Sequence, residues 1–300
     1  MIQKLYGGIE GGGTKFNCAV GNSPENMIAE ARFPTTIPSE TIGQVMEFFA
    51  PYLKKINGIG LGSFGPFDAD PSSPTYGYIT TTPKQHWGNT NILGMLREKI
   101  NVPIAVDMDV AVAGLGEAKW GASKNDSRSL YLTIGTGIGG GYIMDGKPLR
   151  GLVSLEMGHI RIPHDFELDP FRGACPYHAD CFEGLAAGPS ILARFGQRGE
   201  TLPDDHPFWN VEATYIAQAL VNFILTLAPQ RIIIGGGVMG RDFMFPFVRK
   251  KVQELLSGYI HHDRLLKDID QYIVPPALGK HAGVLGSIAL IMDSENKTVL

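Results

Sequence analysis

The amino-acid sequence predicts an α/β protein made of two similar halves. Strand-like and helix-like segments alternate along its 300 residues. An apolar strand, a turn rich in glycine and threonine, and a second strand occur together twice, once over residues 6–20 and once over residues 130–143. Because each copy opens one half of the chain, we expect a duplicated fold that holds one nucleotide between its halves.

Both turns are candidate phosphate sites. Glycines let the backbone approach a polyphosphate, and backbone N–H groups together with a threonine hydroxyl can bind its oxygens. Either stretch alone could equally be a tight hairpin that binds nothing, but the repetition favours phosphate binding. Neither stretch fits the G-x-x-x-x-G-K-[ST] pattern or a strand-to-helix G-x-G-x-x-G pattern.

Composition restricts the class of protein. With 44% hydrophobic residues, the chain can bury a large core, and its length suggests two domains. A net charge of −4 without a dense Lys/Arg stripe predicts no nucleic-acid partner. We expect no membrane partner, because the sequence shows neither a leader-like start nor a bilayer-spanning apolar run. Three cysteines are too few for a secreted disulfide framework, so a cytoplasmic location is the default expectation.

The rest of the first half continues to alternate. The glycine-rich strand that begins at Asn57 could admit a ligand close to its backbone, or its glycines could only turn the chain. The Pro-rich segment over residues 68–90 is either functional or an ordered surface loop. The expected elements after the first strand pair are a strand (27–33), a helix (41–53), a strand (57–67), a helix (91–99) and a strand (102–106).

Asp109 follows the last of these strands and opens a small-residue helix over residues 110–120. Open α/β sheets place catalytic groups at the carboxyl ends of their strands. An ordinary helix N-cap would occupy the same position, and position alone favours the N-cap. The polar break after Trp120 then separates an N-terminal lobe, residues 1–121, from a C-terminal lobe, residues 122–282.

A compact set of metal-binding side chains follows the second hairpin. Cys175, His178 and Cys181 stand at three-residue intervals, and His159 lies upstream. Two thiolates and two imidazoles can bind a tetrahedral zinc ion. Since the protein supplies all four ligands, the predicted zinc site is closed and structural.

The second half ends with further α/β elements. A buried strand over residues 231–234 runs into Gly235-Gly236-Gly237, which could contact a ribose or adenine or could only turn the chain. The two phosphate turns upstream favour nucleotide contact. The other expected elements are helices over 212–227, 247–256 and 283–292 and a strand over 272–274.

In these motifs the chain resembles the ROK group of bacterial sugar kinases, and the resemblance covers nearly the whole chain in order. Glu156-Met157-Gly158-His159 and the Cys-Pro-Tyr-His-x-Asp-Cys-Phe-Glu-Gly stretch most resemble the fructokinase branch of the group. The other matching stretches are Gly11 to Lys15, Asp109 to Glu117, Ile134 to Gly139 and Gly235 to Gly237.

The resemblance implies the two-lobed hexokinase fold of the actin-like (ribonuclease H-like) ATPases, with a structural zinc site and with the C-terminal helix over 283–293 joined to the N-terminal lobe. It also implies a homodimer that transfers the γ-phosphate of ATP, delivered with Mg²⁺, to the 6-hydroxyl of D-fructose. Asp109 matches the catalytic base, and Glu156, His159 and Glu183 match the sugar-binding positions. The matching nucleotide-binding positions are Gly11, Gly12, Thr14, Lys15, Thr133, Gly135, Thr136, Gly137, Pro189, Gly236, Gly237 and Val238.

The chain departs from glucokinase-like members of the group next to Asp109. Met108 and Ala111 stand where those members have asparagine. A buried sugar hydroxyl left without a partner costs about 1–3 kcal/mol, so glucose is the less expected substrate. A mannose-specific or broad hexose kinase is the alternative enzyme, and a sugar-sensing protein without turnover is the alternative from another class.

Overall fold

The computed structural model describes residues 4–295, and the chain divides into two compact units. Within the described residues, the first unit comprises residues 4–125, 141–155 and 277–295, and the second comprises residues 126–140 and 156–276. This division begins close to the expected boundary after residue 121. The chain returns to the first unit at Gly141, which the expected boundaries did not include, and again at Ala277, ahead of the C-terminal helix that was expected to join this unit.

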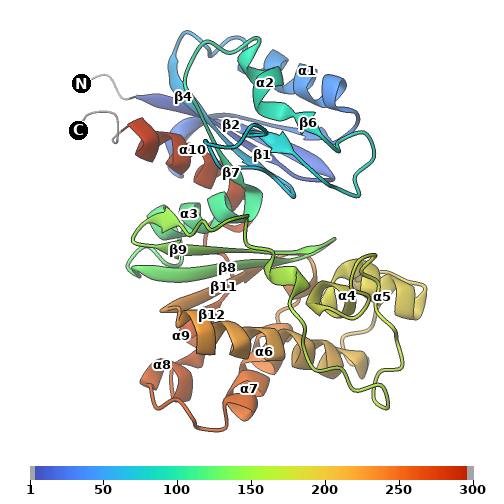
Figure 1. Cartoon of the computed structure of the whole chain (residues 1–300). Helices are drawn as coiled ribbons and strands as arrows, with labels where there is room; N and C mark the ends of the chain where they lie inside the picture. Colours follow the sequence, from blue (N-terminus) through green and yellow to red (C-terminus); the bar gives the residue numbers. More distant parts are fainter. Residues whose placement is uncertain (1–3, 296–300) are drawn as a thin grey trace. The chain divides into compact units, whose positions relative to one another are not determined.

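A five-stranded sheet in the order β3-β2-β1-β4-β7 forms the centre of the first unit (Figure 1). β1 pairs antiparallel with β2 and parallel with β4, and β4 pairs parallel with β7. The elements of this unit are β1 (Leu5–Gly11), β2 (Lys15–Ser23), β3 (Asn26–Pro34), α1 (Pro38–Phe49), β4 (Ile56–Ser63), β5 (Tyr78–Ile79), β6 (Thr90–Asn91), α2 (Ile92–Arg97), β7 (Ile104–Met108), α3 (Asp109–Trp120), β10 (Lys147–Pro148) and α10 (Ala282–Glu295).

Helices cover both faces of this sheet. A Cβ atom at Gly7 would contact Phe49 of α1, whereas one at the next residue, Gly8, would contact Val284 of α10. Because successive residues of a strand face opposite sides, α1 and α10 lie on opposite faces. Residues 68–90, expected as one long loop, include the two-residue strand β5, which pairs antiparallel with β6 at the end of this segment.

The glycines of β4 make room for helices. A Cβ atom at Gly60 would overlap the carbonyl oxygen of Ser287 in α10, and one at Gly62 would overlap Val112 in α3. Close approach between a strand and a helix is one reason for a glycine inside a strand. These two glycines therefore leave space for α10 and α3. Their role is close helix packing, whereas the sequence had suggested either a ligand contact or a turn.

Gly60→Ala is expected to lower the free energy of unfolding by about 1–3 kcal/mol, because the added methyl group has no space against Ser287. Urea denaturation measures the change. Gly43→Ala in α1 is the matched control, since a Cβ atom there has no atom within 4 Å. Equal stability of the two variants would contradict the packing described for β4 and α10.

A second five-stranded sheet repeats the strand order of the first. Its order is β10-β9-β8-β11-β12, so in both sheets the strands lie third, second, first, fourth and fifth in chain order. β8, β11, β12 and the first residues of β9 lie in the second unit. This matching order confirms the duplication expected from the two hairpins. The remaining elements are β8 (Arg128–Ile134), β9 (Ile138–Met144), α4 (Phe182–Ala186), α5 (Gly188–Phe195), α6 (Phe208–Leu227), β11 (Arg231–Gly235), α7 (Met244–Leu256), α8 (Asp263–Leu266), α9 (Ile269–Tyr272) and β12 (Ile273–Val274).

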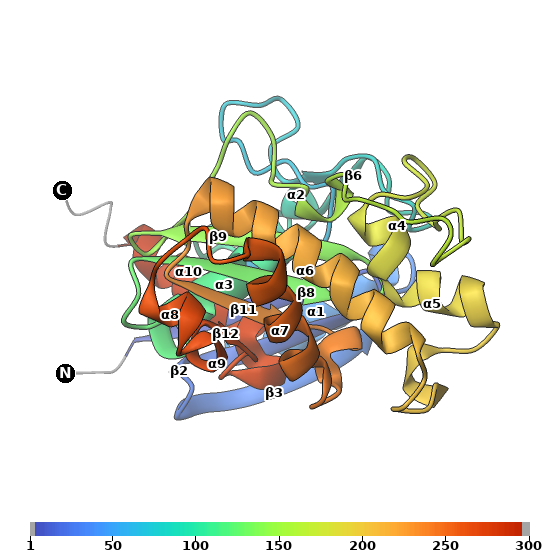
Figure 2. The same ribbon diagram turned by 90° about the horizontal axis from the view of Figure 1, so that it is seen from below.

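Helices α6 and α7 pack against each other and lie in front of β8, β11 and β12 when the chain is seen from below (Figure 2). β8 and β11 are parallel, and so are β11 and β12. The division between the units falls within β9, between Gly140 and Gly141. Over the described residues, 4–295, no helix combines the length and the apolar character needed to cross a membrane.

Candidate functional site

Asp109 is the first residue of α3, directly after β7. The N-cap position belongs to Met108, and one carboxylate oxygen of Asp109 accepts a hydrogen bond from the N–H of Val110 at 2.8 Å. The residue is half-buried. Asp109 is therefore not the N-cap residue of α3 but its first helical residue. Its carboxylate lies at the carboxyl end of a parallel strand, where α/β folds place reactive groups.

An ion pair between the buried Asp107 and the partly exposed Arg150 supports the chain just before Asp109. Asp107 is 3% exposed, and its Oδ1 accepts the N–H of Met108 at 2.9 Å. Its Oδ2 accepts Nη2 of Arg150 at 2.6 Å and Nε at 3.1 Å. Two-point binding of a guanidinium group fixes geometry as well as charge. No local pattern in the sequence indicates this pair, because its members lie 43 positions apart.

The first glycine turn and Asp109 follow the carboxyl ends of the parallel strands β1 and β7, so both lie at the same end of the first sheet. Strand register places Glu10 of β1 beside Gly62 of β4, and Gly62 beside Asp107 of β7. The turn itself joins β1 to β2, with the N–H of Gly12 bonded to the carbonyl of Lys15 at 2.9 Å. Thr14 is exposed, so its hydroxyl and the neighbouring N–H groups can meet an anion.

Glu10 is a further candidate site residue, which no sequence motif indicated. Its carboxylate accepts Nδ2 of Asn17 at 2.7 Å, immediately before the first turn. Burial raises the pKa of Glu10 above its ordinary value, against the opposing effects of Asn17, Lys15 and His281. A carboxylate enclosed beside a candidate phosphate turn is the kind of oxygen ligand that Mg²⁺ prefers.

The second glycine turn lies entirely in the second unit. The N–H of Gly135 is bonded to the carbonyl of Gly137 at 2.9 Å, and Thr136 is exposed at the tip. The carbonyl of Gly135 accepts the N–H of Gly188 at 2.7 Å, next to Pro189 in the first turn of α5. The structure therefore brings Pro189, one of the predicted nucleotide-binding residues, close to the turn.

The triple glycine after β11 lies beside this turn. A Cβ atom at Gly135 would be 3.9 Å from the backbone nitrogen of Gly237. Gly236 has a φ of 93° and leaves no room for a side chain against Ile134, whereas Gly237 is exposed with open space around it. Val238 is 7% exposed, so its part in the predicted nucleotide set would come from its backbone. Thr133 pairs with Gly235 at the ends of β8 and β11.

The predicted sugar residues in the second unit lie close together. Glu156 precedes a 3₁₀ turn, Met157–His159, and its carbonyl accepts the N–H of His159 at 3.0 Å. Glu183 lies 4.0 Å from Nε2 of His159. Surrounding protein atoms desolvate Glu156 and raise the pKa of its carboxyl, with His159 opposing the shift and Glu183 adding to it.

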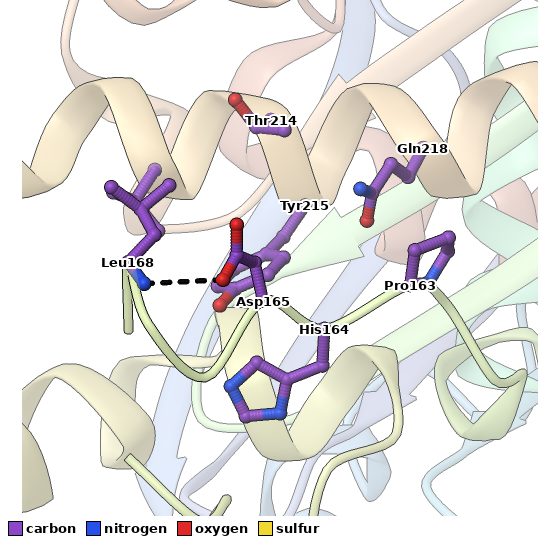
Figure 3. A pocket seen from close by; sticks show the side chains of 8 residues that line it. Pro163, His164, Asp165, Leu168, Thr214, Tyr215 and Gln218 are labelled. Carbon is purple, nitrogen blue, oxygen red and sulfur yellow. Dashed lines mark hydrogen bonds between the residues drawn. The ribbon is translucent and has the colours of Figure 1, made fainter. Parts of the chain in front are cut away.

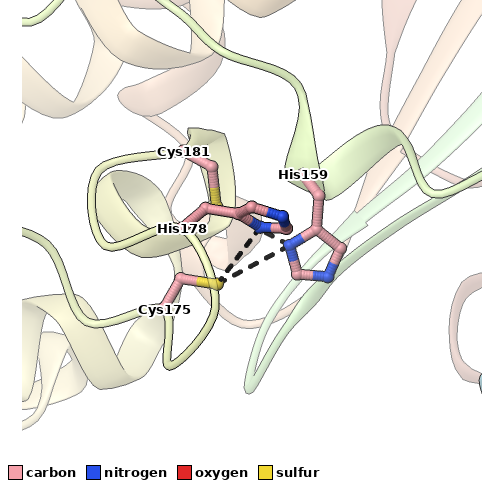
Figure 4. Close-up of side chains that lie close together, drawn as sticks. All are labelled: His159, Cys175, His178 and Cys181. Atoms are coloured by element: carbon pink, nitrogen blue, oxygen red, sulfur yellow. Dashed lines mark hydrogen bonds between the residues drawn. The ribbon is translucent and has the colours of Figure 1, made fainter. Parts of the chain in front are cut away.

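The four predicted metal ligands converge (Figure 4). Nδ1 of His159 lies 3.7 Å from Sγ of Cys175 and 3.6 Å from Sγ of Cys181, and Nδ1 of His178 lies 3.7 Å from Sγ of Cys175. One ligand atom from each residue fits within 4.8 Å of all the others. Bonds of about 2.0–2.3 Å around a tetrahedral ion require spacings of this size, so the residues fit zinc.

A buried polar network stabilises the loop ahead of the metal ligands. Asp169 accepts hydrogen bonds from Nη2 of Arg194 at 2.9 Å and from the hydroxyl of Tyr215 at 2.8 Å. Burial alone would raise the pKa of Asp169, but the bonds from Arg194 and Tyr215 outweigh it and lower the pKa. The side chains of Asp169 and Arg194 are 8% and 4% exposed, so neither charge has much access to water.

A cavity of about 150 Å³ adjoins this network, between the loop that follows Ile162 and helix α6 (Figure 3). Asp165 of that loop accepts the N–H of Leu168 at 3.2 Å. None of the predicted catalytic, nucleotide or sugar residues lines the cavity. Its lining residues are Pro163, His164, Asp165, Leu168, Val211, Thr214, Tyr215 and Gln218.

Asp169→Asn is expected to lower the free energy of unfolding at pH 7 by about 3–5 kcal/mol, because it leaves the charge of Arg194 buried without its partner. A lowered carboxyl pKa stabilises the fold above the pKa of the unfolded chain, about 3.9 for Asp. This contribution is lost as the pH falls through the lower folded-state pKa.

The difference between wild type and Asp169→Asn should therefore shrink as urea denaturation is repeated from pH 7 down to pH 3. Asp165→Asn, in the exposed part of the same loop, is the control. A difference that stays constant over this range would contradict the role given to the Asp169 carboxylate.

Two α/β units with the same strand order, each opening on a glycine-rich hairpin, define the actin-like ATPase class of folds. The chain belongs to the ROK family, which it matches over residues 6–294.

Relatives of known name agree with this family over nearly the whole chain. The chain is 44% identical to the fructokinase of Lactococcus lactis subsp. cremoris over 286 residues, which cover 95% of this chain and 96% of that protein. It is 43% identical to the fructokinase of Zymomonas mobilis subsp. mobilis over 302 residues, covering 98% and 99%. The ROK hexokinase from Thermus thermophilus has the same fold, with a TM-score of 0.77 at 23% identity, covering 97% of this chain and 99% of that one.

Proposed function

We propose that this protein is an ATP-dependent fructokinase that transfers the γ-phosphoryl group of ATP to the 6-hydroxyl of D-fructose. The observation that carries the choice of sugar is the identity of 43–44% to two fructokinases over at least 95% of the chain. The Glu156–His159 motif, with Glu183 beside His159, supplies the polar side chains that such a sugar needs.

Asp109 is the proposed general base. Its carboxylate accepts the proton of the 6-hydroxyl, the hydroxyl oxygen forms a bond to the γ-phosphorus, and the bond from phosphorus to the bridging oxygen of ADP breaks. The two glycine turns orient the phosphates through backbone N–H groups and the hydroxyls of Thr14 and Thr136. The Asp107–Arg150 pair keeps the backbone before Asp109 in place.

Mg²⁺ bound to ATP would neutralise charge that develops on the phosphate oxygens. We assign Glu10, whose carboxylate lies beside the first turn, to hold this ion directly or through water. His159, Cys175, His178 and Cys181 would hold zinc as a structural ion. We also propose that the protein is a homodimer located in the cytoplasm.

The position of phosphoryl transfer tests the mechanism. With Mg-ATP and fructose, we expect a product that phosphoglucose isomerase converts to glucose 6-phosphate, because only the 6-phosphate of fructose is its substrate. Product that accumulates untouched by the isomerase would contradict transfer to the 6-hydroxyl. Product formation from mannose alone would favour the mannose kinase.

A further inference from the structure

Glu183 lies between the Cys/His cluster and the second phosphate turn. Its Oε2 accepts the N–H of Ile138 at 2.8 Å, directly after the turn. Its Oε1 lies 4.0 Å from Nε2 of His159, while Nδ1 of the same imidazole faces the two cysteines. The two oxygens of one carboxylate thus face two different sites.

The segment that carries Glu183 holds the turn at both ends. At one end Glu183 binds the N–H of Ile138, and at the other the N–H of Gly188 binds the carbonyl of Gly135. Between them, a Cβ atom at Gly137 would lie only 2.8 Å from Oε2 of Glu183. The backbone of the turn is therefore packed against this carboxylate as well as bonded to it.

The cluster in turn fixes the position of Glu183. Cys181 is the N-cap residue of α4, whose second residue is Glu183, and Cys181 is fully buried. An imidazole that binds a metal through one nitrogen is commonly oriented by a carboxylate at the other nitrogen. Loss of the ion would release both the start of α4 and the imidazole that faces Glu183.

We propose that Glu183 is a positioning residue for the nucleotide: it couples the order of the Cys/His cluster to the second phosphate turn, so ADP binding depends on both. This inference rests on the proposed function and goes beyond the sugar contact expected of Glu183. A turn with preset N–H groups binds phosphate without first losing conformational freedom, and an unsupported turn does not.

The test is the Kd of Mg-ADP in the absence of sugar, measured by calorimetry on zinc-loaded protein. Glu183→Ala is expected to raise this Kd about tenfold. Substitution of a residue that hydrogen-bonds a metal ligand typically costs at least this factor in metal affinity or activity. Glu183→Gln keeps an oxygen that can accept the N–H of Ile138, so it should restore most of the ADP affinity. Glu200→Ala, at an exposed site in the same unit, is the matched control.

Removing zinc should raise the Kd for Mg-ADP in wild type but have little further effect in Glu183→Ala, because both changes act through one contact. In wild type, the same removal should speed amide hydrogen exchange in the peptide that covers Gly135 to Gly139. This second readout needs no variant, so it remains decisive if Glu183→Ala does not fold.

A folded, zinc-loaded Glu183→Ala protein with the wild-type Kd for Mg-ADP would overturn the inference. Unchanged amide exchange in verified zinc-free wild type would overturn it as well. Wild-type protein that does not bind Mg-ADP at all would instead overturn the proposed function, so the two failures are distinguishable.

Discussion

Asp109→Asn lowers kcat for fructose phosphorylation by about 10²–10⁴-fold, the range that a general base contributes. The amide has nearly the shape of the carboxylate and can accept the N–H of Val110, but it cannot take the proton of the sugar hydroxyl. We expect the melting temperature and the Kd for Mg-ADP to stay close to wild type. Steady-state kinetics with a coupled ADP-release assay measures the loss.

Asp145→Asn, in the exposed turn between β9 and β10, controls for the change of charge. It should leave kcat unchanged. Retention of more than about a tenth of the wild-type kcat by Asp109→Asn would remove Asp109 as the base, because that loss is smaller than general-base catalysis explains.

Cys181→Ser is expected to prevent zinc binding at the Cys/His cluster and to destabilise the second unit. Structural zinc contributes about 10–16 kcal/mol in small zinc-binding peptides, which is as large as the whole stability of many domains. Loss of even a few kcal/mol in a unit of this size lowers the melting temperature by about 10 °C. We also expect the KM for fructose to rise, since His159 is assigned to both the proposed metal site and the proposed sugar site.

Elemental analysis and calorimetry check this result together. Wild type should contain about one zinc per chain, as a four-ligand structural site requires. Cys18→Ser changes a buried cysteine of β2 in the first unit, far in sequence from the cluster, and should retain its zinc. Zinc-free wild-type protein with normal stability and normal kinetics would show that the cluster is not a structural zinc site.

Much of the fold was predictable because its signals are local. The Gly/Thr turns between apolar strands identified both hairpins, and the matching strand orders confirmed the duplication. The Cys/His spacing likewise identified four residues whose ligand atoms the structure places within 4.8 Å of one another. Such patterns can be recognised from sequence because each one lies within a short stretch of chain or repeats at a fixed spacing.

The parts that sequence could not give are long-range contacts. Nothing in the local sequence joins Arg150 to Asp107 or Glu183 to Ile138, because the members of these pairs lie 43 and 45 positions apart. The buried carboxylate of Glu117 in α3 accepts the N–H groups of Ala277 and Leu278, where the chain returns to the first unit, 160 or more positions later. The glycines of β4 were ambiguous for the same reason, since the helices that fill their space come from distant parts of the sequence.

The measurement that tests the account most directly is kcat/KM with Mg-ATP for fructose, mannose, glucose and N-acetylmannosamine, by coupled ADP release. We expect turnover with a clear preference for fructose and poor use of glucose, because the side chains of Met108 and Ala111 offer no hydrogen bonds to a pyranose hydroxyl. Equal rates or a preference for another sugar would contradict the fructokinase proposal. No turnover with any of the four sugars would contradict the kinase and favour a sugar-sensing protein.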